Sequence, residues 1–274
     1  MLKNLNQKVS PGGPNVPAIE IRNLRKSFRK GRDEILKGVN FTAWEGKVTF
    51  LLGSSGSGKS VLLKHVLGLL IPDSGEIFIN GEPMVGTDPR HMNEIRKNFG
   101  MLFQSSALFD DFTVFGNVSF PLVEHTKLSR DEMHAKVAEK LSAVGLDIEK
   151  VGDKFPREIS GGMKRRVALA RAIILEPRII LYDEPTTGLD PVTRNTVDEL
   201  IVQTNRRFGL TSVVISHDMF SAVNCADQLA FLHRGEIVFF GTPHEFQNCD
   251  HPMVKSFLDA ERSHVARHAP EATI

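Results

Sequence analysis

The stretch that decides the fold is Gly53-Ser54-Ser55-Gly56-Ser57-Gly58-Lys59-Ser60, which directly follows the apolar run Val48-Thr49-Phe50-Leu51-Leu52. It fits the pattern G-x-x-x-x-G-K-S/T, in which a buried strand, a glycine-rich turn and a helix follow one another. An apolar helix expected over residues 58–70 completes that context. A glycine-rich turn that matches by chance is the alternative, and the flanking elements weigh against it. The sequence therefore predicts a phosphate-binding loop and a nucleotide site.

The residue types of this loop suit a bound phosphate. Gly53, Gly56 and Gly58 permit backbone angles closed to other residues, so consecutive N–H groups can turn inward around an anion. The following helix presents the positive end of its dipole to the same anion. We expect Lys59 to reach the β- and γ-phosphates and the Ser60 hydroxyl to bind Mg²⁺. The predicted contacts of the loop also include Ser54, Ser55 and Ser57.

The composition is that of an ordinary globular protein, with 41% hydrophobic and 24% charged residues among 274. A net charge of +1 gives no global basic field that would favour nucleic acid. Cys225 and Cys249 make no disulfide framework, lack metal-ligand spacing and suit a reducing cytosol. No apolar run approaches the roughly eighteen residues of a membrane span, and the N-terminus lacks the apolar region of a secretory signal. A role at a membrane would then depend on a partner.

Strand patterns dominate the first part of the chain. Residues 1–17 are polar and rich in proline and glycine, so we expect a flexible segment. Apolar residues alternate over 19–24, and a second strand-like run covers 35–44. Two further short strands are expected at 76–80 and 99–103.

Helical and strand patterns alternate in the rest of the chain. The expected helices are one that starts at Ser129-Arg130-Asp131-Glu132 with its body at 133–144, and one at 194–208. The expected strands are at 179–182, 212–215, 228–232 and 237–240. Their order predicts an α/β fold with a parallel sheet covered by helices. The chain then divides into the flexible segment, a folded domain at 18–259 with an inserted helical subdomain at about 104–165, and a tail at 260–274.

Two acids, Asp183 and Glu184, end the apolar strand expected at 179–182. In P-loop enzymes an aspartate at this strand end helps to hold Mg²⁺. Its neighbour Glu184 would face the γ-phosphate, where a carboxylate can polarise the attacking water. Acids also end strands as helix caps, but their pairing with a phosphate loop favours the magnesium site.

A second anion-binding turn lies between the loop and the acids, in Ile159-Ser160-Gly161-Gly162-Met163-Lys164-Arg165-Arg166. Ser160 and two glycines begin a helix there, and a simple helix cap is the alternative. One nucleotide needs only one phosphate loop. At this point the chain resembles the ATP-binding-cassette (ABC) ATPases over residues 19–258, with five motifs in the same order and spacing. In that family this signature binds the γ-phosphate of an ATP held by the opposite subunit; Met163 departs from the glutamine of many members.

The resemblance implies roles for further residues. Phe28 would stack on adenine, with a core phenylalanine as the alternative. Gln104 would contact Mg²⁺ and the lytic water, and His217 would sense the γ-phosphate. Asp190, in Thr187-Gly188-Leu189-Asp190, belongs to a loop that touches the opposite subunit in the family. The implied fold is a P-loop NTPase (RecA-like) parallel-sheet core with an antiparallel β subdomain and an inserted helical subdomain.

The resemblance also implies two copies facing head to tail with two ATP molecules between them. ATP would close this dimer and hydrolysis would open it. The implied catalytic residues are Lys59, Gln104, Glu184 and His217. The implied ligands of Mg²⁺ are Ser60, Gln104 and Asp183. The implied nucleotide contacts are Phe28, Gly53, Ser54, Ser55, Gly56, Ser57, Gly58, Lys59, Ser60, Ser160, Gly161, Gly162 and Asp190.

The stretch after Gln104 indicates a docking surface, because five phenylalanines fall between Phe103 and Phe120. Some would belong to the core, and the others would leave an apolar groove. In ABC transporters a coupling helix of the membrane permease inserts here. Segments 107–110, 113–118 and 120–122 resemble the ATPases of the Mla phospholipid-transport systems, which work with a permease, an MCE-domain protein and a STAS-domain subunit. This implies phospholipid transport from the cytoplasmic face of a Gram-negative inner membrane, which maintains outer-membrane lipid asymmetry.

Other functional classes fit less well. A DNA-maintenance ATPase needs a long coiled coil or a DNA-binding domain, and this chain has no sustained heptads; we expect no nucleic-acid partner. A translation-type cassette ATPase carries two phosphate loops, and this chain has one. A transporter cassette for amino acids, ions or a lipoprotein stays open, because an ATPase subunit does not touch its cargo.

Overall fold

The computed structural model describes residues 16–268 apart from residues 30 and 32, with side chains as far as residue 260. The expected flexible segment lies outside this range except for its last two residues, as do the last six residues of the expected tail. No helix in the described part of the chain is long and apolar enough to cross a membrane.

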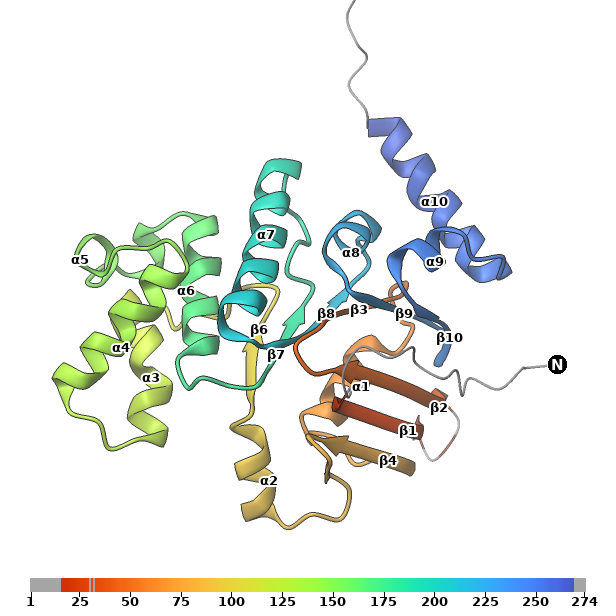
Figure 1. The fold of residues 1–274 in the computed structure, drawn as a ribbon, viewed down its shortest axis with the longest axis horizontal. Coiled ribbons are helices and arrows are strands. Elements are labelled where there is room, and N and C mark those ends of the chain that lie inside the picture. The colour runs from red at the N-terminus through yellow and green to blue at the C-terminus, as the bar shows by residue number, and fades with distance from the viewer. Residues whose placement is uncertain (1–15, 30, 32, 269–274) are drawn as a thin grey trace, which may run out of the picture.

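The strands of the described residues form two sheets (Figure 1). They are β1 (Pro17–Phe28), β2 (Asp33–Trp44), β3 (Val48–Leu52), β4 (Ser74–Ile79), β5 (Glu82–Pro83), β6 (Phe99–Leu102), β7 (Ile179–Asp183), β8 (Thr211–Ser216), β9 (Gln228–His233) and β10 (Glu236–Gly241). The larger sheet has the order β10-β9-β3-β8-β7-β6 and is parallel except for the edge strand β10. The smaller sheet, β2-β1-β4-β5, is antiparallel throughout. This is the expected α/β architecture.

Helices cover the larger sheet and extend beyond it. They are α1 (Lys59–Val66), α2 (Pro89–Arg96), α3 (Val114–His125), α4 (Arg130–Ala143), α5 (Ile148–Val151), the 3₁₀ turn η1 (Pro156–Glu158), α6 (Gly161–Ile173), α7 (Pro191–Phe208), α8 (Met219–Cys225), α9 (Pro243–Gln247) and α10 (Pro252–His268). Helices α3 to α6 gather at the end of the molecule away from the antiparallel sheet (Figure 1).

The alternation of side chains along β3 divides the interior into two cores. Val48, Phe50 and Leu52 face a core shared with α3, α4, α6 and α7, whereas Leu51 faces the core that joins α1 to the antiparallel sheet. The helical subdomain therefore has no separate core. Its buried residues are continuous with those of the central sheet.

Several expected boundaries are wrong for identifiable reasons. Helix α1 ends at Val66 and not at residue 70, because Gly68 takes a left-handed φ of 64°. Helix α7 begins three residues early, because Asp190 accepts backbone N–H groups at its start and a proline occupies the first position. Helix α2, capped in the same way by Asp88, was not predicted at all.

Two expected domain limits fall inside helices. The limit at about 165 cuts α6, and the limit between 259 and 260 cuts α10. By contrast, α4 lies close to its expected position, because Ser129 and Glu132 form a complete capping box.

Candidate active site

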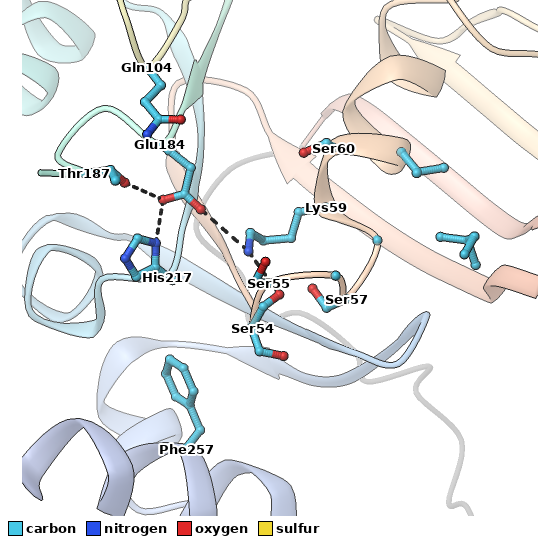
Figure 2. A pocket seen from close by; sticks show the side chains of 14 residues that line it. Ser54, Ser55, Ser57, Lys59, Ser60, Gln104, Glu184, Thr187, His217 and Phe257 are labelled. Carbon is cyan, nitrogen blue, oxygen red and sulfur yellow. Dashed lines mark hydrogen bonds and ion pairs between the residues drawn. The ribbon is translucent and has the colours of Figure 1, made fainter. Parts of the chain in front are cut away.

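A pocket of about 750 Å³ opens where the central parallel strands end (Figure 2). Strands β3, β8, β7 and β6 are neighbours, so the loops after their carboxyl ends meet at one edge of the sheet. The pocket residues that the sequence predicted are Ser54, Ser55, Gly56, Ser57, Gly58, Lys59, Ser60, Gln104, Glu184 and His217. Residues far apart in the chain thus reach one pocket.

The loop between β3 and α1 has the geometry of a phosphate cradle. Gly56 and Gly58 have φ values of 77° and 111°, which only glycine adopts without strain. Gly53 does not have a positive φ, so the expected reason is wrong there. A side chain at this position would lie 2.5 Å from the Leu232 carbonyl and 2.6 Å from Oγ of Ser57. Gly53 is required by space.

The ammonium of Lys59 points back across the loop between β3 and α1. It donates to the carbonyl of Gly53 at 2.6 Å and that of Ser54 at 3.3 Å, and it lies 3.6 Å from Oε1 of Glu184. Burial lowers the pKa of Lys59, with the charge of Glu184 acting against this. The cation is therefore held by oxygen atoms that phosphate oxygens can replace.

The carboxylate of Glu184 joins this lysine to His217 (Figure 2). Its Oε2 lies 2.8 Å from Nδ1 of His217 and accepts from the Thr187 hydroxyl at 3.0 Å. Burial alone would raise the pKa of Glu184, but the hydrogen bond and charge of His217 lower it overall. The same hydrogen bond raises the pKa of His217. Glu184 also has a left-handed φ of 49°, which is rare for this residue type.

The oxygen donors near this carboxylate fit a hard divalent cation. Ser60 and Gln104 are exposed to the pocket, and Asp183 is half-buried at the end of β7. Burial and the charge of Glu184 raise the pKa of Asp183, and a nearby cation would oppose both effects. The described residues hold no cluster of three or more His, Cys, Asp or Glu side chains suited to a metal. Mg²⁺ does not need such a cluster, because hydroxyl, amide and phosphate oxygens are suitable ligands for it.

Other predicted residues lie outside this pocket. Phe28 ends β1, 38% exposed, with the Lys26 ammonium 5.7 Å from its ring. Ser160 caps α6 by accepting from the Met163 N–H, and Asp190 caps α7. Met163 packs against the core, which accounts for an apolar residue at this position. The structure therefore does not bring the signature turn to the phosphate loop of the same chain.

Three pocket residues were missed by the sequence analysis: Ile35, Val61 and Phe257. Phe257 comes from α10, where its ring packs 4.9 Å from that of Phe231. No local pattern relates this helix to the phosphate loop, so only the tertiary structure shows it.

Comparisons with known proteins agree on one family. The family model described as "ABC transporter" matches residues 36–187. A "Probable ribonucleotide transport ATP-binding protein mkl" of Mycobacterium tuberculosis is 42% identical, over 92% of this chain and 69% of its own. An "Intermembrane phospholipid transport system ATP-binding protein MlaF" of Escherichia coli is also 42% identical, over 85% and 86%. Among solved structures, the ATP-binding cassette MJ0796, a dimer with ADP and Pi, is 31% identical with a TM-score of 0.73, over 82% of this chain and 98% of its own.

We expect Glu184→Gln to lower the pKa of His217 towards its ordinary value of 6.5, because the anionic acceptor is lost. Folding raises this pKa, so the contribution of the His217 proton is fully present below about pH 6.5 and is lost as the pH rises through the folded-state value. At low pH the contribution of Glu184 is lost in turn, as the pH falls through the lowered pKa of this carboxylate. An NMR titration of the imidazole in the nucleotide-free chain measures the shift. Thr187→Val is the control, because it removes a neighbouring donor and keeps the charge. An unchanged pKa in Glu184→Gln would contradict this pairing.

Proposed function

The chain belongs to the ABC transporter family and is an ATPase, and from this premise we propose that it drives phospholipid transport between bacterial inner and outer membranes. The predicted family, fold class and ATPase activity are confirmed. The observation that supports phospholipid as the cargo is the 42% identity to MlaF over 86% of that protein. The mycobacterial relatives are equally similar and carry a ribonucleotide name, but this chain spans only 69% of their length. Another cargo is therefore the competing hypothesis.

We propose that the phosphate loop binds ATP and that Lys59 leaves the Gly53 carbonyl for the phosphate oxygens. Backbone N–H groups and the start of α1 would hold the same anion. Ser60, Gln104 and Asp183 would hold Mg²⁺, which neutralises phosphate charge when bound. Glu184, released from the lysine, would orient and polarise the attacking water.

His217 would keep Glu184 ionised while this happens. The 2.8 Å hydrogen bond and the raised pKa of His217 support that role. A proton shared between the two groups would also respond to the charge of the γ-phosphate, which is how His217 would sense it. The catalysis assigned to these residues is positioning and charge stabilisation.

A second copy would complete the site. Side chains added at Gly161 or Gly162 would meet nothing within 4 Å, so packing within the chain gives no reason for glycine at the start of α6. Close approach of a phosphate held by another subunit would explain why glycine is needed there. The cassette MJ0796, which was solved as a dimer, supports the pairing of two copies, and we propose that they face head to tail. Asp190 would then face the partner copy, and Phe28 would contact adenine.

Three phenylalanines form the permease surface that we propose. The rings of Phe109, Phe112 and Phe120 lie 5.0–6.0 Å apart, beside a groove of about 920 Å³. Phe109 and Phe112 are 44% and 40% exposed. The buried amide of Asn117 fixes their loop through hydrogen bonds to the backbone of both residues. An apolar surface on a rigid loop suits a docking helix.

The remaining partners follow from the resemblance to Mla systems. They are a permease, an MCE-domain lipid-binding protein and a STAS-domain subunit, and they would hold the chain at the cytoplasmic face of the inner membrane as a peripheral subunit. Affinity purification of the tagged chain from mild-detergent membranes, with mass spectrometry of proteins and lipids, tests this. Recovery of a permease with an MCE-domain protein and phospholipid is expected. Recovery of a permease of another class would contradict the proposal that the cargo is phospholipid.

Lys59→Ala should reduce ATP turnover by about 10²–10³-fold and weaken nucleotide binding, because a phosphate-binding cation is lost. Lys64→Ala is the matched control, since Lys64 is exposed on the same helix. Steady-state hydrolysis and titration with a fluorescent nucleotide measure both effects. Normal turnover in Lys59→Ala would rule out the role of this lysine.

Glu184→Gln should bind ATP, lose hydrolysis and accumulate as a closed dimer, because water is no longer polarised. Size-exclusion chromatography with light scattering, with and without ATP, measures the dimer. Adding Ser160→Arg to the same variant should return it to monomer, since a bulky cation would block the signature turn. A monomer in Glu184→Gln with ATP would contradict the sandwich.

Phe109→Asp should reduce the amount of permease that co-purifies with the chain about tenfold or more, because a charge replaces an apolar contact. Nucleotide binding should be unchanged. Ile71→Asp is the control, since Ile71 is 79% exposed and lies outside the groove. Co-purification from membranes measures the loss. Equal recovery of both variants would move the docking site elsewhere.

A further inference from the structure

A second pocket, of about 440 Å³, lies between α7 and α8 and is separate from the nucleotide site. Asp198 lines it from α7, and Phe220 and Cys225 line it from α8. Asp198 is only 5% exposed, whereas Phe220 is 52% exposed. The pocket thus combines a buried acid with an exposed aromatic ring.

Neither carboxylate oxygen of Asp198 has a hydrogen-bond partner among the described residues. The Ser221 hydroxyl is near enough to affect the acid but does not meet the geometry of a hydrogen bond. Arg194 is paired with Asp218 at 3.0 Å. A buried carboxylate without a donor is unfavourable, and burial raises the pKa of Asp198 to about 6.

Groups of the described chain neutralise this acid only incompletely: Ser221 and the charge of Arg194 act to lower its pKa, and the pKa stays raised. Arg206 lines the same pocket two turns further along α7, and no ion pair joins it to Asp198 in this part of the chain. Glu199, also in the pocket wall, adds a second negative charge. A donor from outside the chain would therefore gain both an ion pair and relief of an unsatisfied acid.

We propose that this pocket receives a lysine or arginine side chain of a partner protein, which pairs with Asp198 while the partner's surface covers Phe220. A basic side chain fits because its alkyl stem can cross the apolar rim before its charge reaches the acid. The aromatic face of Phe220 also attracts a cation. A small free amine inside the pocket would leave most of Phe220 exposed, so a protein surface accounts for more of the site.

The position of the pocket connects its occupant to the nucleotide site. Helix α7 begins directly after Asp190, and α8 begins two residues after His217. The Arg194–Asp218 ion pair joins the first turns of both helices. A partner that spans α7 and α8 would therefore fix the segments that carry Asp190 and His217. This regulatory consequence rests on the proposed function, whereas the binding itself does not.

Photo-crosslinking tests the binding directly. Benzoylphenylalanine replaces Phe220 in the full-length chain, in cells that make it naturally, and crosslinked peptides are identified by mass spectrometry. A crosslink to one protein, next to a lysine or arginine, is expected, and Asp198→Asn should reduce it at least tenfold. Glu199→Gln, an exposed neighbour in the same wall, should leave it unchanged. No crosslink, a crosslink only to a second copy, or equal yields in Asp198→Asn would overturn the proposal.

Stability gives an independent readout that does not need the partner or ATP hydrolysis. If Asp198 is unsatisfied in the isolated chain, Asp198→Asn should raise the melting temperature by roughly 2–4 °C at pH 7.5, because a buried charge is removed. A lower melting temperature, or failure to fold, would show that the acid is satisfied internally and would overturn the proposal. ATPase activity of the isolated variant should match the parent chain. Failure of the proposed function would instead appear as normal turnover in Lys59→Ala, and that result would not change the outcomes expected for Asp198→Asn.

Discussion

Parallel pairing of β3, β8, β7 and β6 is the constraint on which the rest of the structure depends. Parallel strands end at the same edge, so four loops that are far apart in the sequence meet there. The charged groups Lys59, Glu184 and His217 form a line across three of these loops. Opposite charges within the chain satisfy one another along this line. In the proposed mechanism such a site would bind an anion by exchange of partners with little rearrangement.

Much of this arrangement could be predicted because its determinants are local. The phosphate loop lies between an apolar strand and a helix, and Asp183 and Glu184 end a strand, so their positions followed from short patterns. The Ser129 capping box likewise placed α4. The reason for Gly53 was not predictable, since the space at this position is set by the carbonyl of Leu232 from a distant strand.

The parts that escaped prediction depend on contacts between distant segments. Phe257 enters the nucleotide pocket from α10 because it packs on Phe231. The unsatisfied state of Asp198 depends on where Ser221 and Arg194 point, which no sequence pattern records. The ends of α1 and α7 were signalled by Gly68 and Asp190, and periodicity outweighed those signals in the prediction.

The left-handed backbone at Glu184 has a consequence for the site. A residue with a side chain in this conformation loses about 1 kcal/mol relative to glycine or asparagine, which adopt it readily. Replacement by glycine would relieve this strain, but it would also remove the carboxylate that accepts from Thr187, pairs with His217 and lies 3.6 Å from the Lys59 ammonium. The strained backbone at Glu184 is thus tied to the contacts that order the pocket. A cassette with glycine there would lack the carboxylate proposed to polarise water, as expected of a cassette that only binds nucleotide.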